Sequence, residues 1–376
     1  MTENTQADGT ADFVIKYWDI RFSNLCNLAC RSCGTWFSSN WYEDHKRDLP
    51  WRHTVDPYKI WLSEIILQQT RVVQGISYYK AFVTKYPTVA DLAHASEDDV
   101  LTLWKGLGYY SRARNLHYSA KFIMDQHGGN FPREYKDILE LKGVGKYTAA
   151  AISSFAYKLS YPVVDGNVLR VISRLYGITD AIDTPAVIKR VYALSDTLID
   201  KDRPDQYNQA IMEFGAIQCT AKSPNCDNCP FFDQCVAREE HLINQIPYKA
   251  KKIKRKSRFF HYLIWEDGDQ TVVQRREDKD IWQGLYQYPL IETENIKVLR
   301  AADICKDYKG IRANQVTVQK ISDVYVQKIT HRDIHTRFYH LLVSDIQLVI
   351  KEEYFLVDQK KVPNFALPKV IDAYLS

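Results

Sequence analysis

Glu64 lies where a carboxyl group could work as an acid. An Asp-Pro pair at positions 56–57 is typical of a helix start, and the sequence predicts a helix from there to about Gln69. Ile60 and Leu67, four residues before and three after Glu64, share its face and make that face apolar. Apolar surroundings raise the pKa of a carboxyl group, which can then donate a proton near neutral pH. A Glu paired with an Arg at a domain seam would show the same pattern.

A glycine turn and a second carboxylate follow later in the chain. Gly143 and Gly145 make a turn too tight for side chains, where backbone N–H groups can approach an anion. The Ala-rich run behind them starts a helix, whose N-terminus favours the same anion. Asp165, twenty residues past Gly145 (165 − 145), offers a carboxylate at another helix start. The pattern fits a phosphate of a DNA backbone, although a plain helical turn and a plain N-cap for a helix over 166–175 also fit.

Seven of the eight cysteines fall into two clusters, and Cys305 stands alone. In a reducing compartment disulfides are rare, so clustered cysteines indicate a metal site. Four thiolates this close can hold one tetrahedral metal ion or one four-iron cluster, and the spacing alone does not separate the two. The later cluster has the pattern C-x6-C-x2-C-x5-C and consists of Cys219, Cys226, Cys229 and Cys235.

Length and composition are those of a globular protein of two or three domains. The chain has 376 residues, 45% of them hydrophobic and 26% charged. A net charge of +4 does not by itself indicate nucleic acid, but Lys249 to Arg258 holds seven Lys or Arg in ten residues. This run is either a solvated linker or a linker that lies on phosphate. No segment approaches the ~18 apolar residues of a membrane helix, and no signal-peptide core is visible, so we expect a cytoplasmic, nucleoid-associated protein.

Three motifs carry a family resemblance. The Leu-Lys-Gly-Val-Gly-Lys turn at 141–146, followed by Val-Asp-Gly-Asn-Val, resembles the helix-hairpin-helix DNA glycosylase superfamily. Trp-Leu-Ser-Glu-Ile-Ile-Leu-Gln-Gln-Thr at 61–70 resembles the segment around the catalytic acid of MutY-type adenine glycosylases. The later cysteine pattern resembles the [4Fe–4S] loop of the endonuclease III and MutY branch. The resemblance implies a four-iron cluster as the cofactor, with Lys222 as a basic point of its loop.

The resemblance also assigns roles to the two carboxylates. Cleavage of an N-glycosidic bond turns the sugar into a cation and leaves a base that needs a proton. Glu64 would protonate adenine, and Asp165 would stabilise the sugar cation; Asp165 can serve as an N-cap at the same time. Tyr147 stands where lyase relatives carry a nucleophilic Lys, so we expect hydrolysis without a strong lyase step, although Lys146 is adjacent. Further family positions are Asn167 in the active site and Trp51, Arg52 and Glu213 in the substrate pocket.

Two more segments resemble those with which the family opens a duplex, since a base must leave the stack to be cut. Gln69 would plug the gap and Tyr109 would wedge beside the opposite base, although Tyr109 and Tyr110 also suit an ordinary helix start. Arg112 follows and is expected at phosphate. The expected DNA-binding residues are Gln68, Gln69, Thr70, Leu107, Tyr109, Arg112, Gly143, Gly145, Lys146 and Lys222.

The last third of the chain changes to a β pattern. Short β-like runs at 259–265 and 270–274 flank Glu-Asp-Gly-Asp and suggest a hairpin. Residues 281–289 resemble a stretch of the MutY recognition domain, which is Nudix-like; the acidic helix of Nudix hydrolases is not visible, so we expect no phosphohydrolase activity. Thr330 and His331 stand where the family reads 8-oxoguanine, and Ile329 replaces a Phe there. A plain β-turn would also fit this loop.

The amino terminus does not belong to this pattern. Cys26, Cys30 and Cys33 form C-x3-C-x2-C after a strand-like run at 15–22, which resembles the cluster motif of radical SAM enzymes. The glycosylase resemblance begins by about Trp41, which leaves no room for the barrel that such enzymes need. We expect this segment to be a non-functional fragment. The alternatives, which we favour less, are a metal-binding tail and a working radical enzyme.

Together these observations predict a mostly α protein: a helix-hairpin-helix glycosylase with a [4Fe–4S] module and a C-terminal α+β Nudix-like domain. The expected segments are 1–37 as an extension, 38–238 as the catalytic domain, 239–257 as a basic linker and 258–376 as the recognition domain. Within 38–238, a six-helix module spans about 65–156 and the cluster module pairs 38–64 with 157–238. The expected enzyme is a monofunctional, monomeric glycosylase acting on double-stranded DNA with adenine opposite 8-oxoguanine or guanine. Rivals are another mismatch or pyrimidine glycosylase of the superfamily and a non-catalytic damage-binding protein.

Overall fold

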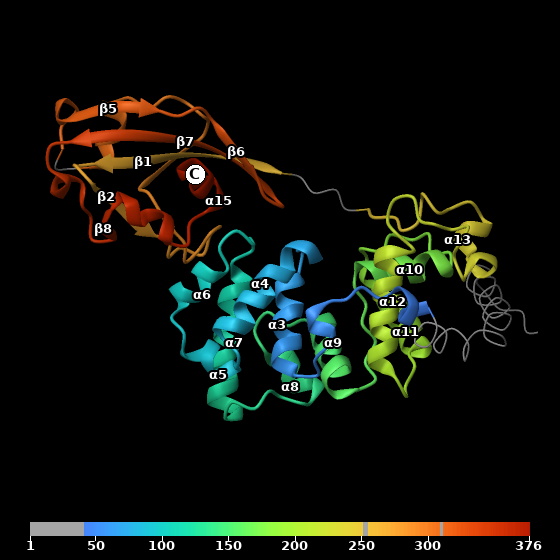
Figure 1. Ribbon diagram of the computed structural model, residues 1–376. Helices are drawn as coiled ribbons and strands as arrows, with labels where there is room; N and C mark the ends of the chain where they lie inside the picture. The colour runs from blue at the N-terminus through green and yellow to red at the C-terminus, as the bar shows by residue number, and fades with distance from the viewer. Residues whose placement is uncertain (1–40, 251–254, 309–310) are drawn as a thin grey trace, which may run out of the picture. The chain divides into compact units, whose positions relative to one another are not determined.

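The computed structural model of the chain describes residues 41–250, 255–308 and 311–376. The amino-terminal extension with its C-x3-C-x2-C motif lies outside these residues, as does part of the basic run. Contacts divide the chain into two compact units, each made from two stretches of sequence. The first unit takes residues up to Ile65 and Phe131–Lys251, and the second takes Ile66–Asn130 and Lys252–Ser376. Figure 1 shows that helices make up the first two-thirds of the described chain and strands most of the remainder.

The first unit is helical, and its helices begin at recognisable capping residues. Thr184 accepts a hydrogen bond at the start of one helix, and Pro185 and Pro204 occupy first helical positions. The helices are α2 (Tyr42–His45), η2 (Pro50–Arg52), α3 (Pro57–Leu67), α8 (Tyr135–Glu140), α9 (Lys146–Tyr157), α10 (Gly166–Leu175), α11 (Pro185–Leu198), α12 (Pro204–Ile217), η3 (Phe232–Gln234) and α13 (Val236–Glu239).

Three buried helices, α3, α9 and α10, hold the candidate active-site residues of this unit in place. On α3, Trp61 and Leu62 have no exposed surface and Ile65 has 2%, so the helix is buried on all sides rather than along one stripe. The alanines at 149–151 let α9 pack closely, and α10 contributes Val168, Val171 and Ile172 to the core it shares with α11 and α12. The helix start at Asp56 and the helix over 166–175 confirm the sequence prediction, whereas α3 ends at Leu67, because Gln69 takes a left-handed backbone.

The second unit combines a group of helices from its first stretch of sequence with two sheets from its second. Its helices are α4 (Val72–Lys85), α5 (Val89–His94), α6 (Glu97–Leu103) and α7 (Ser111–His127). Thr88 and Asp91 form a capping box at α5, and Ser96 caps α6. The strands are β1 (Lys256–Glu266), β2 (Gln270–Arg275), β3 (Tyr286–Gln287), β4 (Leu290–Thr293), β5 (Val316–Ile321), β6 (Tyr325–Lys328), β7 (Arg332–Val343) and β8 (Tyr354–Asp358). Short helical segments are α14 (Ala301–Ile304), η4 (Cys305–Asp307), η5 (Ala313–Gln315), η6 (Ile346–Val349), η7 (Gln359–Asn364) and α15 (Lys369–Leu375).

The larger sheet has the order β4-β1-β7-β5, with β6 also paired to β7, and burial is concentrated in its central strands β1 and β7. β1 and β7 run parallel, with Lys256 opposite Arg332 and Glu266 opposite Leu342. Side chains of β1 alternate between two cores: Leu263 and Trp265 join one, and Phe260, Tyr262 and Ile264 join the other. This alternation explains a strand that is apolar on both faces.

The predicted hairpin over 259–274 is wrong in its pairing, although both runs are strands. The structure joins them only by a bridge between Asp267 and Gln270. β1 lies in the larger sheet, while β2 pairs with β3 and β8 in the smaller one. The physical reason is that both edges of β1 are paired elsewhere: one edge pairs with β7 from Lys256 to Glu266, and the other pairs with β4 from Phe259 to Tyr262. No helix in the described ranges is long and apolar enough to span a membrane.

Candidate active site

Glu64 is buried at the centre of α3, with 6% of its surface exposed. The pKa of this carboxyl group is raised to about 7, chiefly by burial and in part by the nearby charge of Asp165, while a hydrogen bond from Tyr147 acts in the opposite direction. The group therefore carries a proton for part of the time at neutral pH. This is the state that a general acid requires.

The raised pKa also predicts a pH-dependent gain of stability in Glu64→Gln. A carboxyl whose pKa rises from 4.5 in the unfolded chain to about 7 in the folded one destabilises the fold progressively as pH rises from 4.5 to 7. Glutamine removes this penalty, so the variant should exceed the natural chain by up to about 3 kcal/mol above pH 7. The two should converge near pH 4. Urea unfolding at several pH values measures the difference; a constant difference would contradict the assignment.

Tyr147 lies in the first turn of α9 and bonds to Glu64 through its hydroxyl. Burial and the neighbouring carboxylates hold the pKa of this phenol well above its usual value, so it remains a hydrogen-bond donor. The helix begins at Gly145, and Gly143 has φ +86°, a conformation that favours glycine. Lys146 is exposed beside this turn. The hairpin thus directs a phenol to the carboxyl group and leaves its backbone turn and an amine at the surface.

Asp165 caps α10 and is fixed by three N–H groups. Its Oδ1 accepts from Asn167 N at 2.8 Å and Val168 N at 2.7 Å, and its Oδ2 accepts from Asn167 Nδ2 at 2.8 Å. Burial raises the pKa of Asp165, and these donors, together with the charge of Arg170, oppose that rise. Both roles expected of this residue are therefore compatible, since the cap also orients a carboxylate near Glu64.

Two residues that sequence reasoning missed hold Asn167 in place. Arg170 donates from Nη2 to Asn167 Oδ1 at 2.9 Å and to the Gly215 carbonyl at 2.6 Å, and from Nε to the Cys219 carbonyl at 2.8 Å. Gly215 lies so close that a Cβ there would sit 2.7 Å from the Asn167 Cβ. The spacing of Arg170, three residues after Asn167 on one helix, was the available signal.

Gly215→Ala should displace Asn167 and loosen Asp165. The added methyl meets the Asn167 Cβ at 2.7 Å and its backbone carbonyl at 3.0 Å, and backbone cannot yield as a flexible side chain does. We expect base release to slow by at least about tenfold, because small misplacements at a site are costly. Gly166→Ala is the matched control, since a Cβ there meets nothing within 4 Å. Equal rates for the two variants would contradict this account.

Glu213 is a buried carboxylate held by two arginines. Arg47 donates to it from its backbone N at 2.9 Å, Nε at 2.7 Å and Nη2 at 2.7 Å, and Arg52 donates from Nη2 at 2.7 Å. Burial alone would raise the pKa of Glu213, but these bonds and charges lower it to about 2. Trp51 lies beside Arg52 in η2 and is partly buried. Arg47 was missed by the sequence analysis, because its partner lies 166 residues away.

Glu213→Gln should destabilise the first unit by about 3–5 kcal/mol, because removal of one partner leaves buried charge uncompensated. Glu213 is 1% exposed at its side chain and Arg52 is 14% exposed. Glu43→Gln is the control, since its pairing with Lys46 is exposed and should contribute under about 1 kcal/mol. Chemical denaturation compares the two. Equal losses would show that the buried cluster contributes no more than a surface pair.

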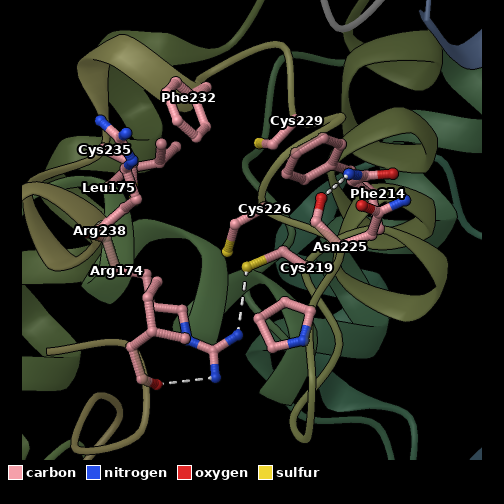
Figure 2. Close-up of a pocket in the computed structure, with 13 residues that line it drawn as sticks. Arg174, Leu175, Phe214, Cys219, Asn225, Cys226, Cys229, Phe232, Cys235 and Arg238 are labelled. Atoms are coloured by element: carbon pink, nitrogen blue, oxygen red, sulfur yellow. Dashed lines mark hydrogen bonds between the residues drawn. The ribbon is translucent and has the colours of Figure 1, made fainter. Parts of the chain in front are cut away.

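The four cysteines at 219–235 line one pocket, into which Figure 2 shows the sulfurs of Cys219, Cys226 and Cys229 directed. Burial raises the pKa of the Cys229 thiol to about 12, and neighbouring thiolates add to this, so the thiolate state requires a cationic partner. Among the described residues no group of three or more Cys, His, Asp or Glu side chains could hold a single metal ion. Four cysteine thiolates around one pocket are a donor set that fits a four-iron cluster.

Comparison with known proteins identifies the family. Residues 62–194 match the HhH-GPD superfamily of base excision DNA repair proteins, 219–235 the iron–sulfur binding domain of endonuclease III, and 261–376 a NUDIX domain. The adenine DNA glycosylase of Buchnera aphidicola subsp. Schizaphis graminum is 30% identical over 351 residues, which cover 89% of this chain and 96% of the relative. The chain belongs to the adenine DNA glycosylase family. It is a MutY-type helix-hairpin-helix glycosylase, a hydrolase of N-glycosyl bonds in base excision repair.

Other relatives support this placement. The adenine DNA glycosylase of Homo sapiens is 43% identical over 209 residues, which cover 53% of this chain and 38% of the relative. A thermostable thymine-DNA glycosylase has a similar structure, with a TM-score of 0.53 and 32% sequence identity. The match covers 57% of this chain and 99% of that one. DNA is thus the partner of this glycosylase, and a [4Fe–4S] cluster is its cofactor. The four cysteines of the matched segment 219–235 would hold the cluster, and the exposed Lys222 lies in the same segment.

In the second unit of the glycosylase, Gln69 and Tyr109 share an unusual backbone. Their φ values are +55° and +48°, a left-handed conformation that costs non-glycine residues of order 1 kcal/mol and that gathers at functional sites. Both side chains are exposed, Tyr109 by 46%. Leu107 is buried, and Gln68 and Thr70 are partly buried. The plug and wedge predicted from the sequence are thus presented on strained turns.

Arg112 does not lie where the sequence predicts. It is 8% exposed, and burial lowers its pKa to about 10. Its Nη1 donates to the carbonyls of Ile66 at 2.8 Å and Gln68 at 2.6 Å, and Nη2 donates to Gly108 at 3.1 Å. The guanidinium is directed inward, toward backbone carbonyls that both turns present to it. Arg112 therefore links the turns that carry Gln69 and Tyr109, and its guanidinium is turned inward rather than to the surface.

Thr330 and His331 occupy the turn between β6 and β7, closed by a bond from Ile329 N to the Arg332 carbonyl at 2.9 Å. This loop is thus a tight bend between two paired strands, and that geometry does not exclude recognition. Thr330 Oγ1 lies 2.5 Å from the Tyr109 hydroxyl within the same unit, and His331 is exposed. Ile329 is partly buried against the core of β1 and β7. Tyr109, the expected wedge, is thus in contact with Thr330, one of the two residues expected to recognise the opposite base.

Proposed function

We propose that this glycosylase removes adenine mispaired with 8-oxoguanine or guanine. The observation that carries the proposal is the buried Glu64, whose pKa of about 7 suits an acid and which lies near the capped carboxylate of Asp165. Both groups are needed for N-glycosidic cleavage and neither is needed for binding alone. Their arrangement argues against the non-catalytic damage-binding rival.

The proposed reaction uses each group once. Glu64 gives its proton to adenine as the bond between base and sugar breaks, and the bonding electrons leave with the base. Asp165 stabilises the cation left on the sugar. Water then adds to that cation and returns a proton to Glu64. Tyr147 holds the Glu64 carboxyl group and offers no amine for a Schiff base, which supports a monofunctional enzyme.

We assign selection of adenine to Arg52 and Trp51, with Glu213 acting through Arg52. A carboxylate has about four lone-pair sites, and four N–H groups already fill those of Glu213. Arg52 can donate to a ring nitrogen of adenine, where guanine carries a proton instead. Trp51 offers a flat apolar surface to the base.

We assign recognition of the base opposite adenine to the second unit. Thr330 and His331 would hydrogen-bond 8-oxoguanine, beside the Tyr109 wedge to which Thr330 is joined. Gln69 would fill the gap in the stack, and Gly143, Gly145, Lys146 and Lys222 would hold phosphates. The match to the thymine glycosylase covers only 57% of this chain, whereas the match to the Buchnera aphidicola adenine DNA glycosylase covers 89%. We therefore prefer adenine to thymine, and propose a monomer that works on the nucleoid, with the segment boundaries predicted above.

A single-turnover assay decides among these readings. Duplexes would carry A opposite 8-oxoguanine, G, C or T, and T opposite G, and products would be read with and without hot alkali. We expect base loss from A opposite 8-oxoguanine and G, with strand breaks only after alkali. Release of T opposite G would favour the thymine rival, and tight binding without any base loss would favour the damage-binding protein.

A further inference from the structure

Arg174 is a buried cation without a carboxylate partner. It lies in the last turn of α10 with 2% of its surface exposed. Among the described residues no carboxylate lies within ion-pair distance of it; its charged neighbour on the same helix, Arg170, is also a cation. A buried charge costs several kcal/mol unless it is paired and hydrogen-bonded. The fold must therefore offer this guanidinium something besides hydrogen bonds.

Hydrogen bonds are complete around Arg174. A guanidinium has five N–H donors, and the structure gives this one five acceptors. Nε donates to the Ile246 carbonyl at 2.9 Å; Nη1 to the Thr220 carbonyl at 2.7 Å and Cys219 Sγ at 3.4 Å; Nη2 to the carbonyls of Ala221 at 3.2 Å and Ile243 at 3.1 Å. The acceptors come from both ends of the segment 219–246, which contains all four cysteines.

Four of these acceptors are neutral carbonyls, and the fifth is the sulfur of a cluster ligand. Figure 2 shows the guanidinium beside that sulfur at the edge of the pocket. A second ligand, Cys235, lies with its sulfur 3.5 Å from the Arg174 carbonyl. An iron–sulfur cluster held by four thiolates carries net negative charge. The missing counter-charge is thus available on the side of the guanidinium that faces Cys219.

We propose that Arg174 is the internal counter-cation of the cluster site, a positioning residue whose charge is balanced only when the cluster is bound. Its bonds to Thr220 and Ala221 on one side and to Ile243 and Ile246 on the other close the segment 219–246 around the pocket. Loading of the cluster and closure of this segment are therefore one coupled event. The assignment does not depend on which base the glycosylase removes.

The charge can be separated from the hydrogen bonds by two substitutions. Arg174→Lys keeps the charge and loses most of the carbonyl bonds, while Arg174→Gln loses the charge and keeps a donor. A nearby cation favours the more reduced state of a cluster, so Gln should shift its reduction potential to more negative values and Lys should leave it near that of the natural chain. Loss of the cluster to a chelator should be about 10–100-fold faster in Gln than in the natural chain, as for other residues that support metal ligands.

The experiment uses the full chain with its cluster and after chelation, and follows visible absorbance, reduction potential and melting temperature. The proposal is supported if Arg174→Gln lowers the melting temperature, relative to the natural chain, by more when the cluster is bound than after chelation. Arg190→Gln is the control, because Arg190 lies 3.8 Å from Asp180 and does not line the pocket. Equal losses in both states with an unchanged potential would overturn the proposal and leave a structural clamp. If Arg174→Gln does not accumulate, Lys decides: a potential near the natural one supports the proposal, and a large negative shift overturns it.

Discussion

Glu64→Gln should bind mispaired DNA as the natural chain does and release almost no adenine. General acid catalysis contributes about 10²–10⁴-fold, so single-turnover base release should fall by that factor or below detection. Glutamine has the same shape and can still bond to the Tyr147 hydroxyl, but it has no proton to give. The burial of Glu64, at 6% exposure, makes the loss a chemical one, since α3 keeps its packing.

The pH profile of the natural chain tests the same group without a substitution. Only the protonated carboxyl donates, and its pKa is about 7. The base-release rate should be level below pH 7 and fall about tenfold for each pH unit above it. Gel-shift binding and quenched-flow release, both measured from pH 5.5 to 9, separate affinity from chemistry. A rate that rises through pH 7, or a Glu64→Gln chain with full activity, would remove Glu64 from the role of acid.

The parts of this site that sequence could predict are those that local spacing controls. An Asp-Pro helix start and an apolar face at four- and three-residue spacing place Glu64, and the Gly-Val-Gly turn with Asp165 places two more helix ends. These features depend on residues within one or two turns, where propensity and capping decide the structure. The helix over 166–175 confirmed this reasoning to the residue.

The parts that it could not predict depend on partners far away in sequence. Arg47 and Glu213 are 166 residues apart, and Arg174 reaches Ile246 across 72. Arg112 has the side chain of a typical phosphate ligand, yet it is directed inward. It donates to the carbonyls of Gln68 and Ile66, which lie 44 and 46 residues away in the sequence. The predicted β1–β2 hairpin failed for the same reason, because β1 pairs with β7 on one edge and with β4 on the other. Long-range pairing leaves no trace in local spacing.

Asp165→Asn should separate the two roles of this residue. Asparagine is as good an N-cap as Asp, and its side-chain oxygen can still accept from Asn167 N and Val168 N. The fold should therefore keep its stability, while the negative charge beside the sugar is lost. Loss of one preorganised electrostatic contact costs about 10²–10³-fold in rate, and we expect a fall of this size in adenine release.

Asp165→Ala completes the comparison, because it removes the cap as well as the charge. It should lose about as much rate as Asp165→Asn and, in addition, about 0.5–2 kcal/mol of stability, which thermal unfolding would detect. An Asn variant with the natural rate would show that Asp165 serves only as a cap. An Asn variant as unstable as Ala would show instead that the third bond, from Asn167 Nδ2 to Oδ2, governs the fold of α10. The stability of Asn and the rates of both variants thus distinguish a carboxylate that stabilises a cation from one that only begins a helix.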